Sequence, residues 1–74
     1  MAYNGEMPGI QTINESYYCV RTKPDGPISV LTTNSYMVGQ YNAETGNTSW
    51  HRVVLAAQKA FIENWLHRHF PPKN

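Results

Sequence analysis

Three histidines are the residues with which this chain could bind a metal ion. His67 and His69 lie two residues apart in a segment with helical spacing, and His51 lies earlier in the chain. Helical residues two apart point about 200° away from each other around the axis, so His67 and His69 cannot share an ion on one face. Glu63 and His67 have the i, i+4 spacing, which is also that of an ordinary surface contact. We therefore expect the cluster from His67 to His69 to complement the negative end of a helix dipole. We expect the protein to bind no cofactor.

Cys19 is the one thiol that could act as a nucleophile. Tyr18 and Val20 flank it in a segment with strand character, with no helix N-terminus or glycine-rich turn beside it to activate a thiolate. The sequence also lacks the Gly-x-Ser-x-Gly motif of a serine hydrolase. We expect Cys19 to be a small buried apolar residue and the protein to be non-enzymatic.

Aromatic side chains are the most abundant candidates for recognition, with five tyrosines, two tryptophans and two phenylalanines in 74 residues. That number exceeds what the core of so small a domain needs, so some must remain at the surface. Tyrosine, tryptophan and arginine are enriched at protein interfaces. The sequence therefore predicts a small protein-binding, inhibitor or adaptor module that also forms a homo-oligomer, and its candidate binding residues are Tyr36, Tyr41, Trp50, Arg21 and Arg52.

A nucleotide-sized ligand or nucleic acid, bound through aromatic and arginine residues of the predicted sheet, is the alternative partner. A formal net charge of +1 with no run of Lys or Arg gives little attraction for a long phosphate backbone. A mononucleotide needs only one or two arginines and an aromatic ring, so this objection affects it less. A nucleotide-sized ligand and a nucleic acid both remain alternative partners.

Length and composition restrict the architecture to one small domain. A single cysteine cannot form an internal disulfide, so stability must come from apolar packing or from a partner subunit. The N-terminus has no basic start followed by an apolar run, and no apolar stretch approaches the roughly 18 residues of a membrane span. We expect a soluble cytoplasmic protein that does not enter membranes.

Turn residues and β-branched residues define the elements that must position these side chains. Residues 1–15 are expected to form a flexible arm, with Ile10 and Ile13 docking on the single α+β domain of residues 16–74. Residues 16–22 and 28–33 are predicted to be the strands of a hairpin around the sequence Lys-Pro-Asp-Gly-Pro. A third strand is expected at 36–41, where Gly39 indicates a bulge or a close backbone approach.

Residues 48–54 allow two interpretations. Either a helix begins near Ser49, or these residues form a fourth strand and the helix begins near Leu55. A helix beginning at Ser49 would place His51 and Arg52 against the positive end of the helix dipole, which favours the strand.

The C-terminal helix is predicted over residues 55–70, because Pro71 and Pro72 cannot continue it. Its period places one apolar sector against the sheet. We expect the helix to contribute Phe61, Ile62, Trp65 and Leu66 to the core, facing Val20, Val30, Val38 and Val54 or their strand neighbours. The predicted fold is α+β: a small antiparallel β-meander of three to four strands covered by one C-terminal α-helix.

Strand alternation over 48–54 would place Trp50 and Arg52 on one face, with Tyr41 nearby across the hairpin. An arginine is rarely buried unpaired, so either Arg52 extends out from the edge of the core or the pair is exposed. We favour an exposed aromatic–cation pair that serves recognition.

Overall fold

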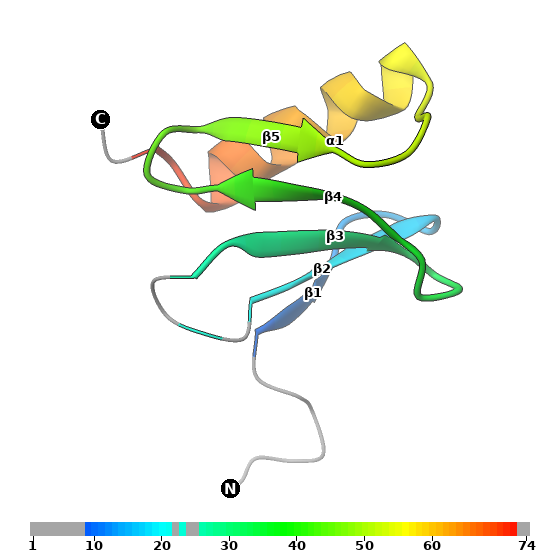
Figure 1. Ribbon diagram of the computed structural model, residues 1–74, viewed down its shortest axis with the longest axis horizontal. Coiled ribbons are helices and arrows are strands. Elements are labelled where there is room, and N and C mark those ends of the chain that lie inside the picture. Colours follow the sequence, from blue (N-terminus) through cyan, green and yellow to red (C-terminus); the bar gives the residue numbers. More distant parts are fainter. Residues whose placement is uncertain (1–8, 22, 24–25, 73–74) are drawn as a thin grey trace, which may run out of the picture.

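The computed structural model describes residues 9–21, 23 and 26–72, which form five strands and one helix (Figure 1). Every strand is antiparallel to its neighbour, and the order in the sheet is the order in the chain. The elements are β1 (Ile10–Thr12), β2 (Tyr17–Val20), β3 (Ile28–Thr32), β4 (Met37–Asn42), β5 (Asn47–Trp50) and α1 (Ala56–His69).

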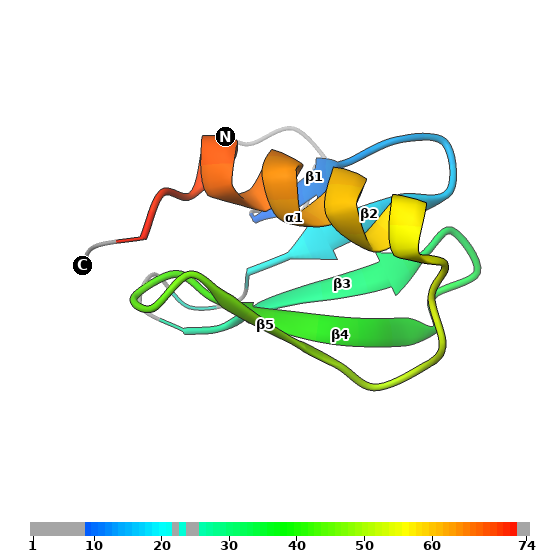
Figure 2. The same cartoon turned by 90° about the horizontal axis from the view of Figure 1, so that it is seen from above.

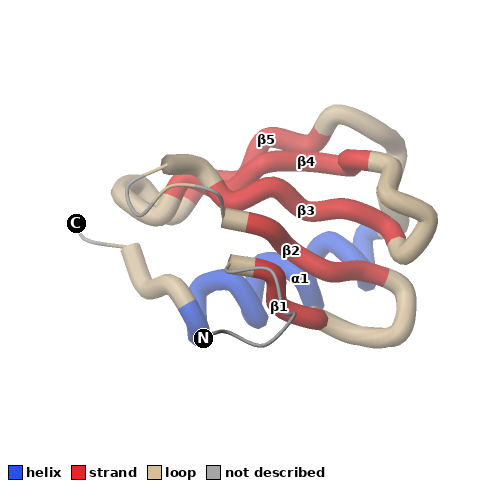
Figure 3. The backbone as a smooth tube through the Cα atoms, turned by 90° about the horizontal axis from the view of Figure 1, so that it is seen from below, coloured by secondary structure: helices blue, strands red, loops and turns tan. Residues whose placement is uncertain are grey.

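The sheet is a meander with α1 along one side of it (Figures 2 and 3). The predicted fold class, an antiparallel meander followed by a C-terminal helix, is therefore confirmed, with five strands instead of three to four. The other side of the sheet has no covering element in the described part of the chain (Figure 3). We call this second side the open face.

β1 is the strand that was not predicted, and it lies inside the segment expected to be a flexible arm. Ile10 pairs with Val20 and Thr12 with Tyr18, so residues 10–12 belong to the sheet and the prediction of an arm is wrong for them. The sequence signal was weak because β1 has only three residues and all of them are exposed. Ile13 is buried, as its predicted docking requires. Residues 1–8 of the predicted arm lie outside the described residues.

Strand alternation assigns each row of side chains to one side of the sheet. Cys19, Val30 and Gly39 lie opposite one another on β2, β3 and β4 and are buried on the helix side. Val20 lies one residue farther along β2, in register with Ser29, and so belongs to the open face. Of Val20 and its strand neighbours, the neighbour Cys19 is the residue that faces the helix, and Val30, Val38 and Val54 are buried as expected.

Gly39 is a point of close backbone approach, as predicted. A Cβ atom there would lie 2.7 Å from the Ser49 carbonyl oxygen and 3.1 Å from Cε3 of Trp50. The register between β3 and β4 shifts at the adjacent position, so the predicted bulge is also present. The missing side chain lets Trp50 lie across the sheet toward α1.

The predicted fourth strand is shorter than expected. It ends at Trp50 and not at Val54, and residues 51–55 form an irregular connection to α1. The competing helix from Ser49 is absent, and α1 begins one residue after the predicted Leu55. Leu55 has the extended backbone of an N-cap residue, but no side chain caps the helix there.

α1 packs on the sheet through Ile62 and Leu66, which are fully buried. Trp65 is half-buried, and Phe61 is 48% exposed, so its predicted place in the core is wrong. Phe61 lies about 100° around the helix from Ile62, beyond the width of helix that a flat sheet can cover. No helix in the described part of the chain is long and apolar enough to cross a membrane.

Candidate recognition site

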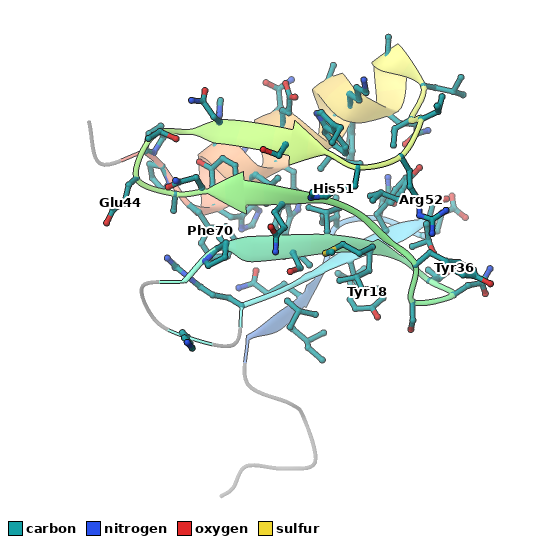
Figure 4. All side chains as sticks on the ribbon, viewed as in Figure 1. Tyr18, Tyr36, Glu44, His51, Arg52 and Phe70 are labelled. Atoms are coloured by element: carbon teal, nitrogen blue, oxygen red, sulfur yellow. The ribbon has the colours of Figure 1, made fainter. Side chains whose placement is uncertain are left out.

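Arg52 and Tyr36 form an exposed aromatic–cation pair. The guanidinium carbon of Arg52 lies 5.5 Å from the centre of the Tyr36 ring, within the range of a cation–π contact. Tyr36 is 59% exposed, and Arg52 is exposed as well. Two of the five predicted binding residues are therefore in contact at the surface, beside the turn between β3 and β4 (Figure 4).

A row of larger side chains on the open face begins at Met37, the residue that follows Tyr36 in the chain. Tyr18, Leu31 and Met37 are cross-strand neighbours on β2, β3 and β4. Met37 is 40% exposed, and the other two are partly exposed. We call the set formed by Tyr18, Leu31, Tyr36, Met37 and Arg52 the open-face patch.

The turn between β3 and β4 fixes one end of the open-face patch. Ser35 has a φ of 70°, in the left-handed region, and its hydroxyl lies 3.1 Å from the Tyr18 hydroxyl. The backbone N–H of Tyr36 donates to the Thr32 hydroxyl, and the N–H of Thr32 donates to the Tyr36 carbonyl. The patch is therefore held by contacts on both sides of the turn.

Trp50 contacts residues of α1, whereas Arg52 contacts Tyr36. The indole N–H of Trp50 donates to Oε2 of Glu63 at 3.0 Å, and the Lys59 ammonium lies 5.8 Å from the ring centre. Trp50 therefore links β5 to α1 on the helix side of the sheet. The expected pairing of Trp50 with Arg52 is wrong because β5 ends at Trp50, so strand alternation does not extend to Arg52.

Tyr41 is fully buried and belongs to the core. Its hydroxyl donates to the Phe70 carbonyl at 2.6 Å, and its ring lies 5.7 Å from that of His67. Burial raises the pKa of the Tyr41 phenol above its ordinary value of 10.0. In this position Tyr41 attaches the end of α1 to the sheet.

Arg21 lies at the other end of the molecule, where its guanidinium carbon is 5.6 Å from the centre of the Phe70 ring. Its Nε donates to the Gly26 carbonyl at 3.4 Å. Phe70 and the Tyr36–Arg52 pair lie at opposite ends of the sheet in Figure 4. The structure thus brings together Tyr36 and Arg52, while Tyr41, Trp50 and Arg21 connect the sheet to the C-terminal part of the chain.

The five predicted binding residues did not include Tyr18, Leu31 and Met37. A signal was present for Tyr18: if Cys19 is buried, its strand neighbours must point to the opposite face. The same signal was present for Met37, whose neighbour Val38 was expected in the core.

His67 and His69 lie in the last turn of α1 and Cys19 is buried, as their local sequence predicts. His67 Nε2 lies 2.8 Å from the Gly46 carbonyl, and the His69 ring stacks on Trp65 with centroids 4.0 Å apart. Within the described residues, no three His, Cys, Asp or Glu side chains are placed to hold a metal ion. Cys19 is fully buried, and burial raises its thiol pKa to about 11, which disfavours a nucleophilic thiolate at neutral pH.

A shallow depression of about 400 Å³ lies beside the β4–β5 hairpin, away from the open-face patch. Its side chains are mostly uncharged and polar, and Arg52 is not among them. The residues that line it are Pro27, Gln40, Tyr41, Asn42, Thr45, Asn47 and Ser49.

Comparison with known proteins assigns this chain to no family. No protein-family model, no curated protein and no solved structure matches the chain. The candidate site therefore rests on its geometry: an exposed arginine–tyrosine pair continuous with a row of apolar and aromatic side chains.

Proposed function

We propose that this protein is a small non-enzymatic binding module, an inhibitor or adaptor that occupies a protein partner through the open-face patch. The observation that carries the proposal is the contact between Arg52 and the exposed Tyr36 ring. Tyrosine, arginine and methionine are the side chains enriched where protein partners meet. A free, buried Cys19 is compatible with action in the reducing cytoplasm.

Geometry supports a protein partner more than a nucleotide. Tyr41, one of the aromatic residues named for binding, is fully buried on the helix side and cannot stack on a nucleotide base. The depression beside the hairpin has no arginine in its lining. An open, nearly flat patch with partly exposed apolar side chains is typical of a surface that contacts another protein.

The test is recovery of bound partners from native cell extract on the immobilised protein, with quantitative mass spectrometry. A protein retained by the wild-type chain is expected to be lost with Tyr36→Ala and with Arg52→Ala. Arg68→Ala, which removes an exposed arginine from α1, is the matched control and should retain it.

Two outcomes would contradict the proposal. If the patch variants retain the same proteins as the wild type, the patch is not the binding surface. If the material lost with Arg52→Ala is a nucleotide, or a nucleic acid released by nuclease, the alternative function is correct.

A further inference from the structure

α1 has a second apolar face that the fold leaves uncovered. The exposed apolar residues in and just before its first half include Val53, Leu55, Ala57, Ala60 and Phe61. Val53 is 100% and Leu55 74% exposed. We call these five residues the outer helix face; Ala57, Ala60 and Phe61 lie on one side of α1, because residues three and four apart are neighbours on a helix.

This exposure is unusual for the surface of a helix, whose solvent side is ordinarily polar and charged. Only two charged residues, Lys59 and Glu63, occur between Val53 and Asn64. Both contact Trp50, on the side of α1 next to β5. The outer helix face therefore contains no charged side chain over the first half of α1, and Asn64 and Arg68 continue the same side of the helix toward its C-terminus.

We infer that a second copy of this chain covers the outer helix face, so that the protein is a dimer joined helix to helix. An uncharged face meets its own copy without like-charge repulsion, and a net charge of +1 gives the whole chain little self-repulsion. Ala57 and Ala60 leave space beside Phe61, so the ring of one copy can pack against the alanines of the other.

Antiparallel packing of the two helices about a twofold axis brings the same face of both copies into the contact. This arrangement also places the helix dipoles in opposite directions. A contact of this size is on the order of 1,000 Å² in total, the low end for a specific interface, so the dimer is expected to dissociate on dilution. The outer helix face shares no residue with the open-face patch, and the inference of a dimer does not rest on the proposed function.

Ala57→Glu provides a sharp test of the dimer. Ala57 lies in the first turn of α1, which has no acidic residue, and a carboxylate there interacts favourably with the helix dipole. The variant chain should therefore fold at least as well as the wild type. In the dimer, however, the carboxylates of both copies would be placed in an apolar contact.

The measurement is the molar mass of the purified protein by sedimentation, over a dilution series that reaches about 1 mM. We expect the wild-type mass to approach that of a dimer, and Ala57→Glu to raise the dissociation constant at least about tenfold. Ala60→Glu, in the next turn, should do the same. Ser49→Glu introduces the same charge at an exposed position of β5 and should not change the dissociation constant.

The inference is overturned if the wild-type chain remains a monomer throughout the series. It is also overturned if both helix variants still dimerise like the wild type, or if Met37→Glu on the open face abolishes the dimer while Ala57→Glu does not. Circular dichroism of each variant establishes that a change in mass is not a loss of fold.

Discussion

At the scale of single residues, burial of the Cys19 thiol disfavours its ionisation and makes the stability of the fold depend on pH. The thiol ionises near pH 9.0 when exposed, whereas its pKa in the fold is raised to about 11 by burial. The folded chain therefore favours the neutral thiol. Its contribution to the free energy of unfolding is complete below pH 9 and is lost as the pH rises toward 11.

We predict that the free energy of unfolding, measured with urea, falls between pH 8 and pH 10, and that Cys19→Ala reduces this fall by on the order of 1 kcal/mol. Part of the fall should persist in the variant, because burial also raises the pKa of the Tyr41 phenol, which acts in the same direction. Equal pH dependence in the two proteins would show that the Cys19 thiol is accessible to solvent in the fold.

At the scale of elements, local signals in the sequence were sufficient wherever one residue type has one structural meaning. Proline after the helix placed the end of α1 within one residue, and glycine marked the close approach at Gly39. The failures occurred where the outcome depends on tertiary packing. β1 is too short and too exposed to have a pattern of its own, and nothing local indicates that strand pairing stops at Trp50.

In the candidate site, too, residue type was a sufficient signal but the contacts depend on tertiary packing. Tyr36 and Arg52 were identified by residue type, but their contact depends on the path of the chain after β5 and not on strand alternation. Phe61 was assigned to the core because helical periodicity alone does not say how wide a sector the sheet covers.

The two apolar faces of α1 are expected to respond differently to truncation. Ile62→Ala should lower the free energy of unfolding by about 2–5 kcal/mol, because Ile62 is fully buried. Phe61→Ala, one residue earlier, should lower it by less than about 1 kcal/mol in dilute protein, and Trp65→Ala should lie between them. Urea unfolding at low protein concentration measures all three, and Ile62→Val remains measurable if Ile62→Ala does not fold. A larger effect of Phe61→Ala than of Ile62→Ala would reverse the assignment of the faces.

The contact between β4 and β5 is expected to tolerate no side chain at Gly39. Gly39→Ala places a Cβ 2.7 Å from a backbone carbonyl oxygen, which cannot move without separating the strands. We predict a loss of about 1–3 kcal/mol in the free energy of unfolding. Gly26→Ala is the control, since its nearest neighbour would be the Lys23 Cβ at 3.2 Å. A smaller loss for Gly39→Ala than for this control would mean that Trp50 does not pack over Gly39.

At the scale of the whole molecule, the sheet and the helix each have one face directed inward and one directed outward. A dimer through the outer helix face would leave the open face of each sheet on the outside, because α1 lies on the opposite side of the sheet (Figure 2). The two open-face patches would then be available together. A module of this kind could hold two copies of its partner, or one partner with two binding sites.

Bivalence of this type predicts a specific difference between variants. On a surface densely coated with the partner found by the recovery experiment, the wild-type dimer should dissociate more slowly than Ala57→Glu, because both patches bind at once. On a sparsely coated surface the two proteins should dissociate at similar rates, since each patch then acts alone. Tyr36→Ala should bind neither surface, yet sediment as the same dimer as the wild type. If Ala57→Glu and the wild type dissociate equally slowly from the dense surface, the two patches do not act together.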